Sequence, residues 1–295
     1  MSLKKKIYRV AGLGEVLWDV FPEGKRLGGA PANFAAHAQQ LGAHAFVLSA
    51  VGKDALGREA LVKLDQYGID LTGLLEIAPF PTGTVSVDLD QHGNPSYEIQ
   101  ENVAWDHIPL QPAITNTAKH LDAVCFGTLA QRNNTSQNTI FKTLRATSDN
   151  CLKVFDLNFR KNYYHKEMLL QSFDISDVVK MNEEEFVEIQ TLFSLPSNLQ
   201  KGMMSLMERF DLKLAMLTLG RKGSIMMSQN DYSELKANQS VQVKSTVGAG
   251  DAFTAAAVMG WLNQKPLDKI HHKSSDLAAY VCSQLDAVPK ILNHS

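Results

Sequence analysis

The fold of this chain is organised around the stretch Val243-Lys244-Ser245-Thr246-Val247-Gly248-Ala249-Gly250-Asp251-Ala252-Phe253. Its pattern predicts a β-leaning segment, a tight glycine turn and then a helix of small residues from Ala252 to Gly260. Two glycines around one alanine let successive N–H groups point into a single concavity. Such a nest at the start of a helix carries unpaired donors and partial positive charge, so it suits an anion.

Asp251 follows this turn directly, where a carboxylate would repel a bound anion. The position of Asp251 has a chemical explanation if its carboxylate takes a proton from a nucleophile. The neighbouring amides would then stabilise the negative charge of the group that is transferred. The structural alternative is an ordinary loop in which Asp251 caps the helix. This segment alone leaves both interpretations open.

Composition sets outer bounds on the function. The 295 residues suffice for one large α/β domain with a small appendage. The 44% hydrophobic and 20% charged residues are ordinary, and a net charge of −2 without a basic stripe argues against a nucleic-acid-binding protein. Three cysteines without paired spacing indicate reduced thiols. No apolar run reaches the roughly 18–20 residues of a membrane span, so we expect a cytoplasmic protein.

Short apolar runs alternate with helical segments along most of the chain. We expect strands at 7–13, 16–21, 45–51, 123–126, 152–157, 178–181, 214–219, 222–227 and 240–244, and helices at 31–41, 57–67, 136–144, 168–173, 182–193, 199–210 and 277–285. This rhythm predicts an α/β fold with a mostly parallel central sheet and helices on both faces. Ligands of such sheets bind outside the carboxyl ends of the strands.

One segment departs from this rhythm. Residues 83–89 alternate with period two, 92–95 form a turn, and 97–99 return. The pattern predicts an antiparallel hairpin, which is either an edge decoration or a lid, and its length favours a lid. We therefore expect a single domain over residues 1–295 with a β-hairpin lid inserted at about 80–105.

A second glycine-rich segment, Gly28-Gly29-Ala30-Pro31-Ala32-Asn33, opens the helix at 31–41. Its glycines let a ligand approach the backbone, and Asn33 offers both a donor and an acceptor. The alternative is a tightly packed helix with Asn33 on its wet side. Asp19, at the end of an apolar run, is either a ligand contact or a turn residue. A dinucleotide-binding site is disfavoured, because Leu17 stands where the third glycine of that fingerprint would be.

The two glycine motifs together resemble the signatures of the ribokinase/PfkB family of sugar kinases. Three further segments are similar to motifs of that family, in the same order along the chain: Asp156-Leu157-Asn158-Phe159-Arg160, Asn182-Glu183-Glu184-Glu185 and Thr218-Leu219-Gly220-Arg221-Lys222-Gly223. The similarity covers essentially the whole chain. It implies a ribokinase-like fold and an ATP-dependent sugar kinase.

The resemblance also implies roles for particular residues. Asp251 would be the general base, Gly248, Ala249 and Gly250 the anion hole, and Arg160 a contact to the sugar or to its developing phosphate charge. The implied substrate contacts are Asp19, Gly28, Gly29, Asn33, Thr128 and Asn158, and the implied nucleotide contacts are Thr218, Gly220, Lys222, Gly223 and Ser275. Asn182 and Glu185 would hold Mg²⁺ largely through water. On residue chemistry alone, a helix cap with an acidic first turn is the preferred interpretation of this last pair.

Two departures from the family pattern stand out. Ser245 occupies a position where family members usually carry Asp, which puts activation by K⁺ in doubt. Residues 283–287 read Ser-Gln-Leu-Asp-Ala where relatives often have Lys-Gly-Ala, so the outer wall of the adenine pocket is expected to differ.

The segment at 14–22 most resembles the fructokinase branch, and Phe126-Gly127-Thr128-Leu129 points the same way. D-fructose is therefore the first expectation for the substrate. Ribose, 2-keto-3-deoxygluconate and nucleosides remain open, as do a non-catalytic sugar or nucleotide sensor on the same fold and a dinucleotide-dependent oxidoreductase. We expect a homodimer formed through the lid.

Overall fold

The structure is a computed structural model that describes residues 6–89 and 95–291. Within these ranges the central sheet has nine strands in the order β13-β12-β11-β10-β9-β8-β1-β4-β5. Their bounds are β1 (Arg9–Leu13), β4 (His44–Gly52), β5 (Leu74–Ile77), β8 (Ala123–Phe126), β9 (Leu152–Asp156), β10 (Val178–Asn182), β11 (Leu214–Thr218), β12 (Ser224–Ser228) and β13 (Tyr232–Leu235). Neighbouring strands from β5 to β11 run parallel, and β12 and β13 are antiparallel additions at one edge.

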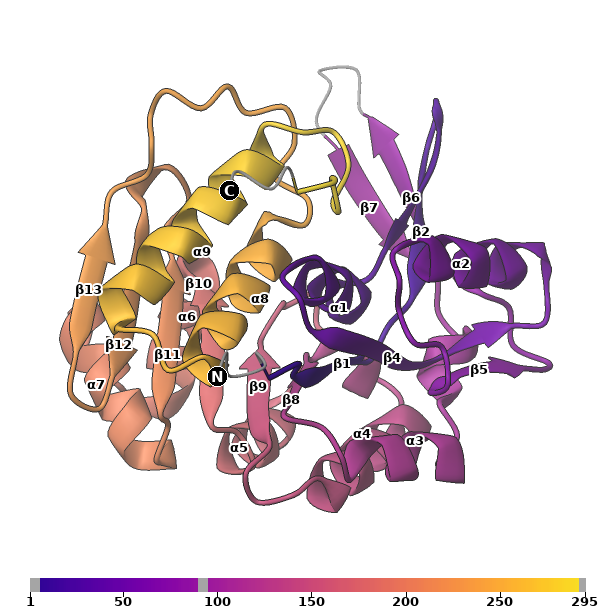
Figure 1. The fold of residues 1–295 in the computed structure, drawn as a ribbon, viewed down its shortest axis with the longest axis horizontal. Coiled ribbons are helices and arrows are strands. Elements are labelled where there is room, and N and C mark those ends of the chain that lie inside the picture. Colours follow the sequence, from indigo (N-terminus) through magenta and orange to yellow (C-terminus); the bar gives the residue numbers. More distant parts are fainter. Residues whose placement is uncertain (1–5, 90–94, 292–295) are drawn as a thin grey trace, which may run out of the picture.

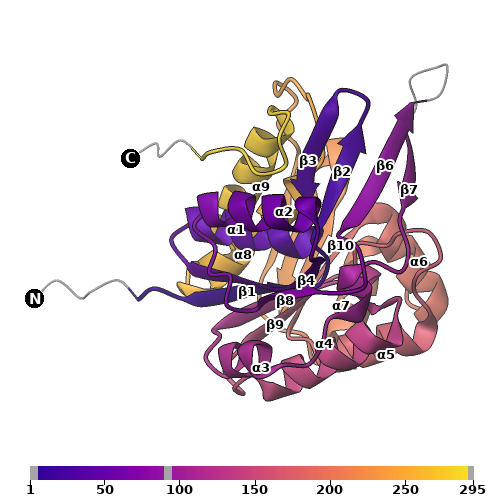
Figure 2. The same ribbon diagram turned by 90° about the vertical axis from the view of Figure 1, so that its right-hand side faces the viewer.

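Helices cover both faces of this sheet (Figures 1 and 2). One face carries α1 (Ala30–Gln40), α2 (Ala55–Gln66), α8 (Ala249–Leu262) and α9 (Leu267–Cys282). The other carries α3 (Pro112–Ala118), α4 (Asn134–Ala146), α5 (Lys166–Asp174), α6 (Glu183–Phe193) and α7 (Leu199–Phe210). Because successive strand residues face opposite ways, Val10 of β1 packs under α1 while Leu13 joins the core beneath α4 and α5. The predicted α/β architecture is confirmed.

A small sheet projects beyond the carboxyl ends of the central strands (Figure 2). In the part of the chain that the structure describes, it has four strands in the order β3 (Gly24–Gly28), β2 (Leu17–Phe21), β6 (Gly83–Leu89) and β7 (Pro95–Ile99). The predicted hairpin is thus β6 and β7, and most of its turn at 92–95 lies outside the described residues. The sheet also includes β2 and β3, so it draws on two chain segments rather than on the insert at 80–105 alone.

Several predicted elements differ from the structure near the C-terminus. Residues 240–244 form no strand; the edge strand β13 lies earlier, and Val243 is 46% exposed. The last helix, α9, begins at Leu267 rather than at residue 277, because Leu267, Ile270, Ser274 and Leu277 continue one buried face.

Three short 3-10 turns complete the described elements: η1 (Ala104–His107), η2 (Leu129–Gln131) and η3 (Gly220–Lys222). Cys125 and Cys151 are buried and Cys282 is half-buried, all as free thiols, as the spacing predicted. None of the helices in the described ranges combines the length and apolarity needed to cross a membrane.

Candidate active site

The glycine turn that anchors the chain leads directly into α8. Gly248 is the residue before the first helical position and has a left-handed backbone with φ 80°. A Cβ placed there would collide with the carbonyl of Ala287. Both the conformation and the close approach therefore require glycine at this position.

The turn presents free amides, as the nest hypothesis requires. Within the described residues, the N–H groups of Gly248 and Gly250 have no protein acceptor. The amide of Ala249 differs from this expectation, because it donates a long hydrogen bond of 3.3 Å to Thr246 O. Two of the three predicted anion-hole donors are therefore available to a ligand at the positive end of α8.

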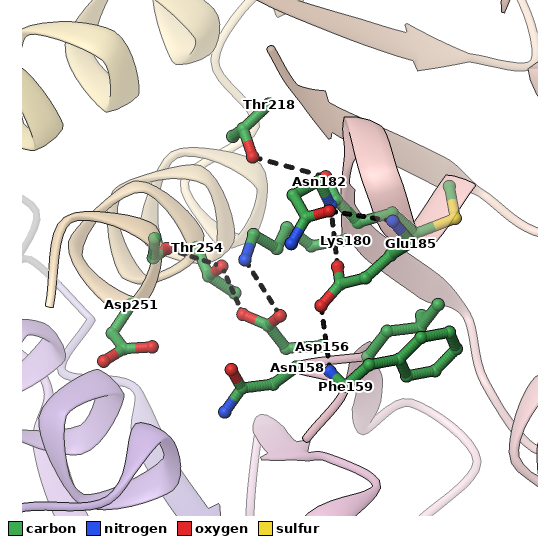
Figure 3. A network of polar contacts seen from close by, with 12 residues as sticks. Asp156, Asn158, Phe159, Lys180, Asn182, Glu185, Thr218, Asp251 and Thr254 are labelled. Carbon is green, nitrogen blue, oxygen red and sulfur yellow. Dashed lines mark hydrogen bonds and ion pairs between the residues drawn. The ribbon is translucent and has the colours of Figure 1, made fainter. Parts of the chain in front are cut away.

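Asp251 lies in the first turn of α8, and its side chain faces away from the helix rather than back onto it (Figure 3). Asn33 Nδ2 on α1 donates a 2.9 Å hydrogen bond to Asp251 Oδ2. No side-chain cap closes α8, so the capping alternative is wrong. Asn33 is only 6% exposed, so its placement on a wet helix face is also wrong.

The surroundings of Asp251 favour its neutral form. Burial and the negative charge of Asp156 raise the pKa of Asp251 to about 6. The hydrogen bond from Asn33 and the positive charges of Lys180 and Arg160 oppose this rise. A carboxyl group with a pKa near 6 is ionised at neutral pH yet basic enough to accept a proton, which suits a general base.

The small sheet contributes a second acidic group to the same region. Asp19 lies within β2, paired with Arg26 on β3, so the alternative of a turn residue is wrong. A Cβ on Gly28 would lie 2.5 Å from Asp19 Oδ2. Burial raises the pKa of Asp19 to about 6, against the charges of Arg160 and Arg26. Gly29, with φ 105°, passes so close to Glu15 O that a side chain would not fit.

The loop after β9 adds the remaining predicted sugar contacts. Asn158 has a left-handed backbone with φ 47°. Arg160 contributes positive charge to both Asp19 and Asp251. Thr128 is buried behind this loop, where its hydroxyl donates to Leu157 O at 2.7 Å. The geometry gives Thr128 a supporting place, and its direct contact with sugar stays a prediction.

Asn182 and Glu185, the predicted metal residues, form a capping box at the start of α6. Asn182 Oδ1 accepts from Glu185 N at 2.8 Å, and the Glu185 carboxylate accepts from Asn182 N at 2.7 Å and from Phe159 N at 2.9 Å. Both groups are therefore already engaged by the backbone (Figure 3). They fit Mg²⁺ that keeps its own water shell better than a directly ligated ion. Among the described residues, no cluster of three His, Cys, Asp or Glu side chains could hold a metal.

The predicted nucleotide residues lie between the end of β11 and the start of β12, except for Ser275, which lies on α9. Gly220 and Gly223 both have positive φ, at 56° and 122°, and a side chain on Gly223 would collide with Leu235 O. Thr218 Oγ1 is 3.4 Å from Met181 O, and Lys222 is tied to Glu183 by a 2.7 Å surface ion pair.

Ser275 belongs to a polar cluster between α9 and β12. Its hydroxyl lies 3.3 Å from Ser224 Oγ, which is 2.8 Å from His271 Nε2. Burial lowers the pKa of His271 to about 4, so this histidine is neutral. A hollow of about 380 Å³ lies on the same flank and is lined by Asn238, Val241, Gln242, Lys244, Asp276, Ala279, Tyr280, Ser283 and Gln284. This hollow includes part of the segment at 283–287 that departs from the family pattern.

Sequence reasoning missed three titratable groups of the region. Lys180 and Glu15 are 7% and 2% exposed, and His271 is fully buried. The signal for Lys180 was present, because a lysine inside the apolar run Val178–Met181 is unusual for a buried parallel strand. Glu15 figured only as a member of the glycine fingerprint that ends at Leu17 and of the segment at 14–22. Its burial raises its pKa to about 7.

Comparison with known proteins adds an independent line of argument. A model of the pfkB family carbohydrate kinases matches residues 9–292. A protein of Pyrococcus horikoshii described as a sugar kinase is 28% identical over 293 residues, which cover 93% of this chain and 90% of that protein. A fructokinase of Klebsiella pneumoniae is 30% identical over 294 residues, covering 94% of this chain and 92% of that protein.

Solved structures also show a similarity to sugar kinases. The crystal structure of the Pyrococcus horikoshii protein in complex with ATP matches with a TM-score of 0.80 at 26% identity, and the match covers 95% of this chain and 94% of that one. The ribokinase-like fold predicted from the motifs is therefore confirmed.

Proposed function

Because this chain belongs to the pfkB family of ATP-dependent carbohydrate kinases, we propose that it transfers the γ-phosphoryl group of ATP to D-fructose and yields fructose 6-phosphate. The fructokinase of Klebsiella pneumoniae supports fructose as the acceptor. So does the segment at 14–22, which supplies Asp19 to the site.

Asp251 is the general base of the proposed reaction. Its carboxylate takes the proton of the 6-hydroxyl as that oxygen bonds to the γ-phosphorus, and the bond between this phosphorus and the bridging oxygen breaks to release ADP. The amides of Gly248 and Gly250 and the guanidinium group of Arg160 stabilise the transferred charge. The observation that carries the proposal is the position of Asp251, next to two free amides and bonded to Asn33 at 2.9 Å.

The other site residues bind and orient the substrates. Asp19, Gly28, Gly29, Asn33 and Asn158 line the sugar side, while Thr218, Gly220, Lys222, Gly223 and Ser275 line the nucleotide side. Asn182 and Glu185 would hold hydrated Mg²⁺, which neutralises charge on the phosphate oxygens of the nucleotide when bound.

A turnover assay with a panel of acceptors tests this function. ADP release is measured with fructose, ribose, 2-keto-3-deoxygluconate and adenosine, for the wild type and for Asp251→Asn. We expect the highest kcat/KM with fructose and a loss of about 10²–10⁴-fold in kcat for the variant. A different preferred acceptor would replace fructose in the proposal. Binding of sugar without ADP release from any acceptor would favour the sensor.

We also propose that the small sheet (β3-β2-β6-β7) is a lid over the sugar and that it mediates a homodimer. Its edge strands, β3 and β7, leave backbone groups unpaired within the described residues, and such edges are commonly covered. Sedimentation equilibrium of the full chain at micromolar concentration should give twice the 32.6 kDa mass of one chain. A mass of one chain would reject the dimer. The cytoplasmic location stays a prediction.

A further inference from the structure

A buried ion pair lies directly beneath the first turn of α8. Lys180 Nζ on β10 is 3.0 Å from Asp156 Oδ1 at the end of β9, and the residues are 7% and 4% exposed (Figure 3). The two residues are register partners on neighbouring parallel strands. Strands buried on both faces normally carry apolar residues here, so this pair needs an explanation.

The pair is connected to the glycine turn by two contacts. Thr254 Oγ1, one turn into α8, is 3.0 Å from Asp156 Oδ2 and 2.9 Å from Gly250 O. Its single proton is shared between these acceptors. A Cβ on Gly250 would lie 2.9 Å from Lys180 Nζ, so the ammonium group rests against Gly250 itself. Side chains of β9, β10 and α8 thus converge on Gly250, whose N–H group has no protein acceptor within the described residues.

Stability alone does not account for this arrangement. Desolvating two charges costs about as much as their attraction returns, and well-packed apolar residues often serve equally well in such a place. What an apolar pair cannot supply is a charged acceptor for the hydroxyl group of Thr254, which also contacts the carbonyl of Gly250. Phosphoryl transfer, by contrast, depends on donors that are fixed in place before the charge moves.

We propose that Lys180 is a positioning residue for phosphoryl transfer: together with Asp156 and Thr254, it braces the turn at residues 248–251 so that its free amides and Asp251 keep their reactive geometry. The kinetic part of this inference rests on the function proposed above. The bracing itself is a property of the protein without ligands and can be measured separately.

Three variants test the brace. Lys180→Met combined with Asp156→Asn replaces the ion pair by a neutral pair and leaves no unpaired charge. Thr254→Val removes only the hydroxyl group, and Thr254→Ser returns it. Lys213→Met serves as the control, because Lys213 pairs with Asp177 at 2.7 Å just before β11 and β10 begin, away from the glycine turn, and is half exposed.

Hydrogen–deuterium exchange of the ligand-free protein is the first readout. We expect faster exchange in the peptide covering 248–256 for the neutral-pair variant and for Thr254→Val, and wild-type exchange there for Lys213→Met. Unchanged exchange in both site variants overturns the brace, whatever the protein phosphorylates.

Steady-state kinetics are the second readout. We expect kcat to fall about 10- to 100-fold in both site variants, as is typical of small misplacements of catalytic groups, with KM for sugar and for ATP changed less than about threefold. Thr254→Ser should recover most of the loss. Faster exchange with wild-type kcat would make the brace purely structural and overturn the proposal. If the neutral-pair variant fails to fold, the comparison of Thr254→Val with Thr254→Ser tests the proposal by itself. A wild type inactive on every acceptor rejects the proposed function, while the exchange data still test the brace.

Discussion

At the residue scale, Asp251 as the proposed general base must be ionised to accept a proton from the sugar, and its surroundings set the pH at which it ionises. Burial and Asp156 raise its pKa to about 6. We therefore expect kcat/KM, which reports the free enzyme, to be constant above neutral pH and to fall about tenfold per pH unit below about 6. A pH series at saturating Mg²⁺ measures this fall of kcat/KM at low pH, the acid limb of the pH profile.

Asp19 is the group most easily confused with Asp251 in that experiment, because its pKa is also raised to about 6. Asp19→Asn serves as the matched control: it should weaken sugar binding and leave the acid limb in place. A limb that disappears in Asp19→Asn would assign the titration to Asp19 and contradict Asp251 as the base.

The raised pKa of Asp251 also has a consequence for stability. A carboxyl group whose folded pKa lies above its unfolded pKa binds its proton more tightly when folded, so its contribution to stability is greatest below the unfolded pKa of 3.8 and is lost as pH rises through about 6. Asp251→Asn should therefore unfold with a higher free energy than the wild type at pH 8, by at most about 3 kcal/mol. Urea denaturation at pH 8 and at pH 4 tests the sign. A stabilisation that is as large at pH 4 would have another origin.

Asn33 donates a hydrogen bond to Asp251, in addition to its proposed contact with the sugar. Its amide donates to the carboxylate at 2.9 Å and thereby lowers the pKa of Asp251. We expect Asn33→Ala to raise the KM for sugar, and also to move the acid limb of kcat/KM to higher pH. Asn33→Asp is not a suitable control because it adds a charge; Asn33→Gln keeps the amide. A raised KM with an unmoved limb would show that the hydrogen bond to Asp251 is absent in solution.

At the scale of elements, the loop before α8 lacks the usual acidic residue. Ser245 Oγ accepts from Val247 N at 3.2 Å, and Ser245 N donates to Cys282 O at 3.3 Å. We expect the rate to change less than about twofold when K⁺ replaces tetramethylammonium, because the hydroxyl group offers no negative charge to a monovalent cation. Ser245→Asp is the matched variant, since an aspartate accepts the same turn hydrogen bond and adds a charge. A large K⁺ stimulation of the wild type contradicts this prediction.

The same elements explain which features the sequence could predict. Runs such as Val178–Met181 and the two glycine motifs carry strong local patterns, so the parallel sheet, α1 and the turn at Gly248 were predicted correctly. β3 (Gly24–Gly28) was missed because its residues Gly-Lys-Arg-Leu-Gly resemble a polar loop, and it becomes a strand only by pairing with β2. Tertiary pairing of this kind leaves little local signal.

The site was predictable in its residue types but not in their connections. The glycine motif predicted amides without acceptors beside Asp251, yet nothing local indicated that Asn33 would donate to Asp251 across 218 positions of sequence. The capping box of Asn182 and Glu185 was foreseen as an alternative, while the bond from Phe159 N to Glu185 depends on the packing of β9 beside β10. Contacts of this kind depend on the assembled fold rather than on any one segment.

At the scale of the whole molecule, the candidate site is divided between the small sheet and the central sheet with its helices. Asp19 and Gly28 belong to the small sheet, whereas Asp251 and the free amides belong to α8 on the central sheet (Figure 2). A sugar that contacts both must draw them into a fixed relation. If the small sheet closed over the sugar, it would also exclude water, which otherwise competes for the phosphoryl group.

Sugar should therefore close the small sheet over α8. With saturating fructose and a non-hydrolysable ATP analogue, we expect a smaller radius of gyration by X-ray scattering and slower hydrogen–deuterium exchange in residues 83–87, relative to the free protein. Asp251→Asn should close in the same way, because it keeps the binding groups and loses only the base, whereas Asp19→Ala should fail to close with fructose since the contact from β2 is gone. If Asp19→Ala closes as the wild type does, nucleotide rather than sugar drives the motion; if the wild type neither contracts nor slows its exchange, the small sheet is a fixed wall of the site and not a lid.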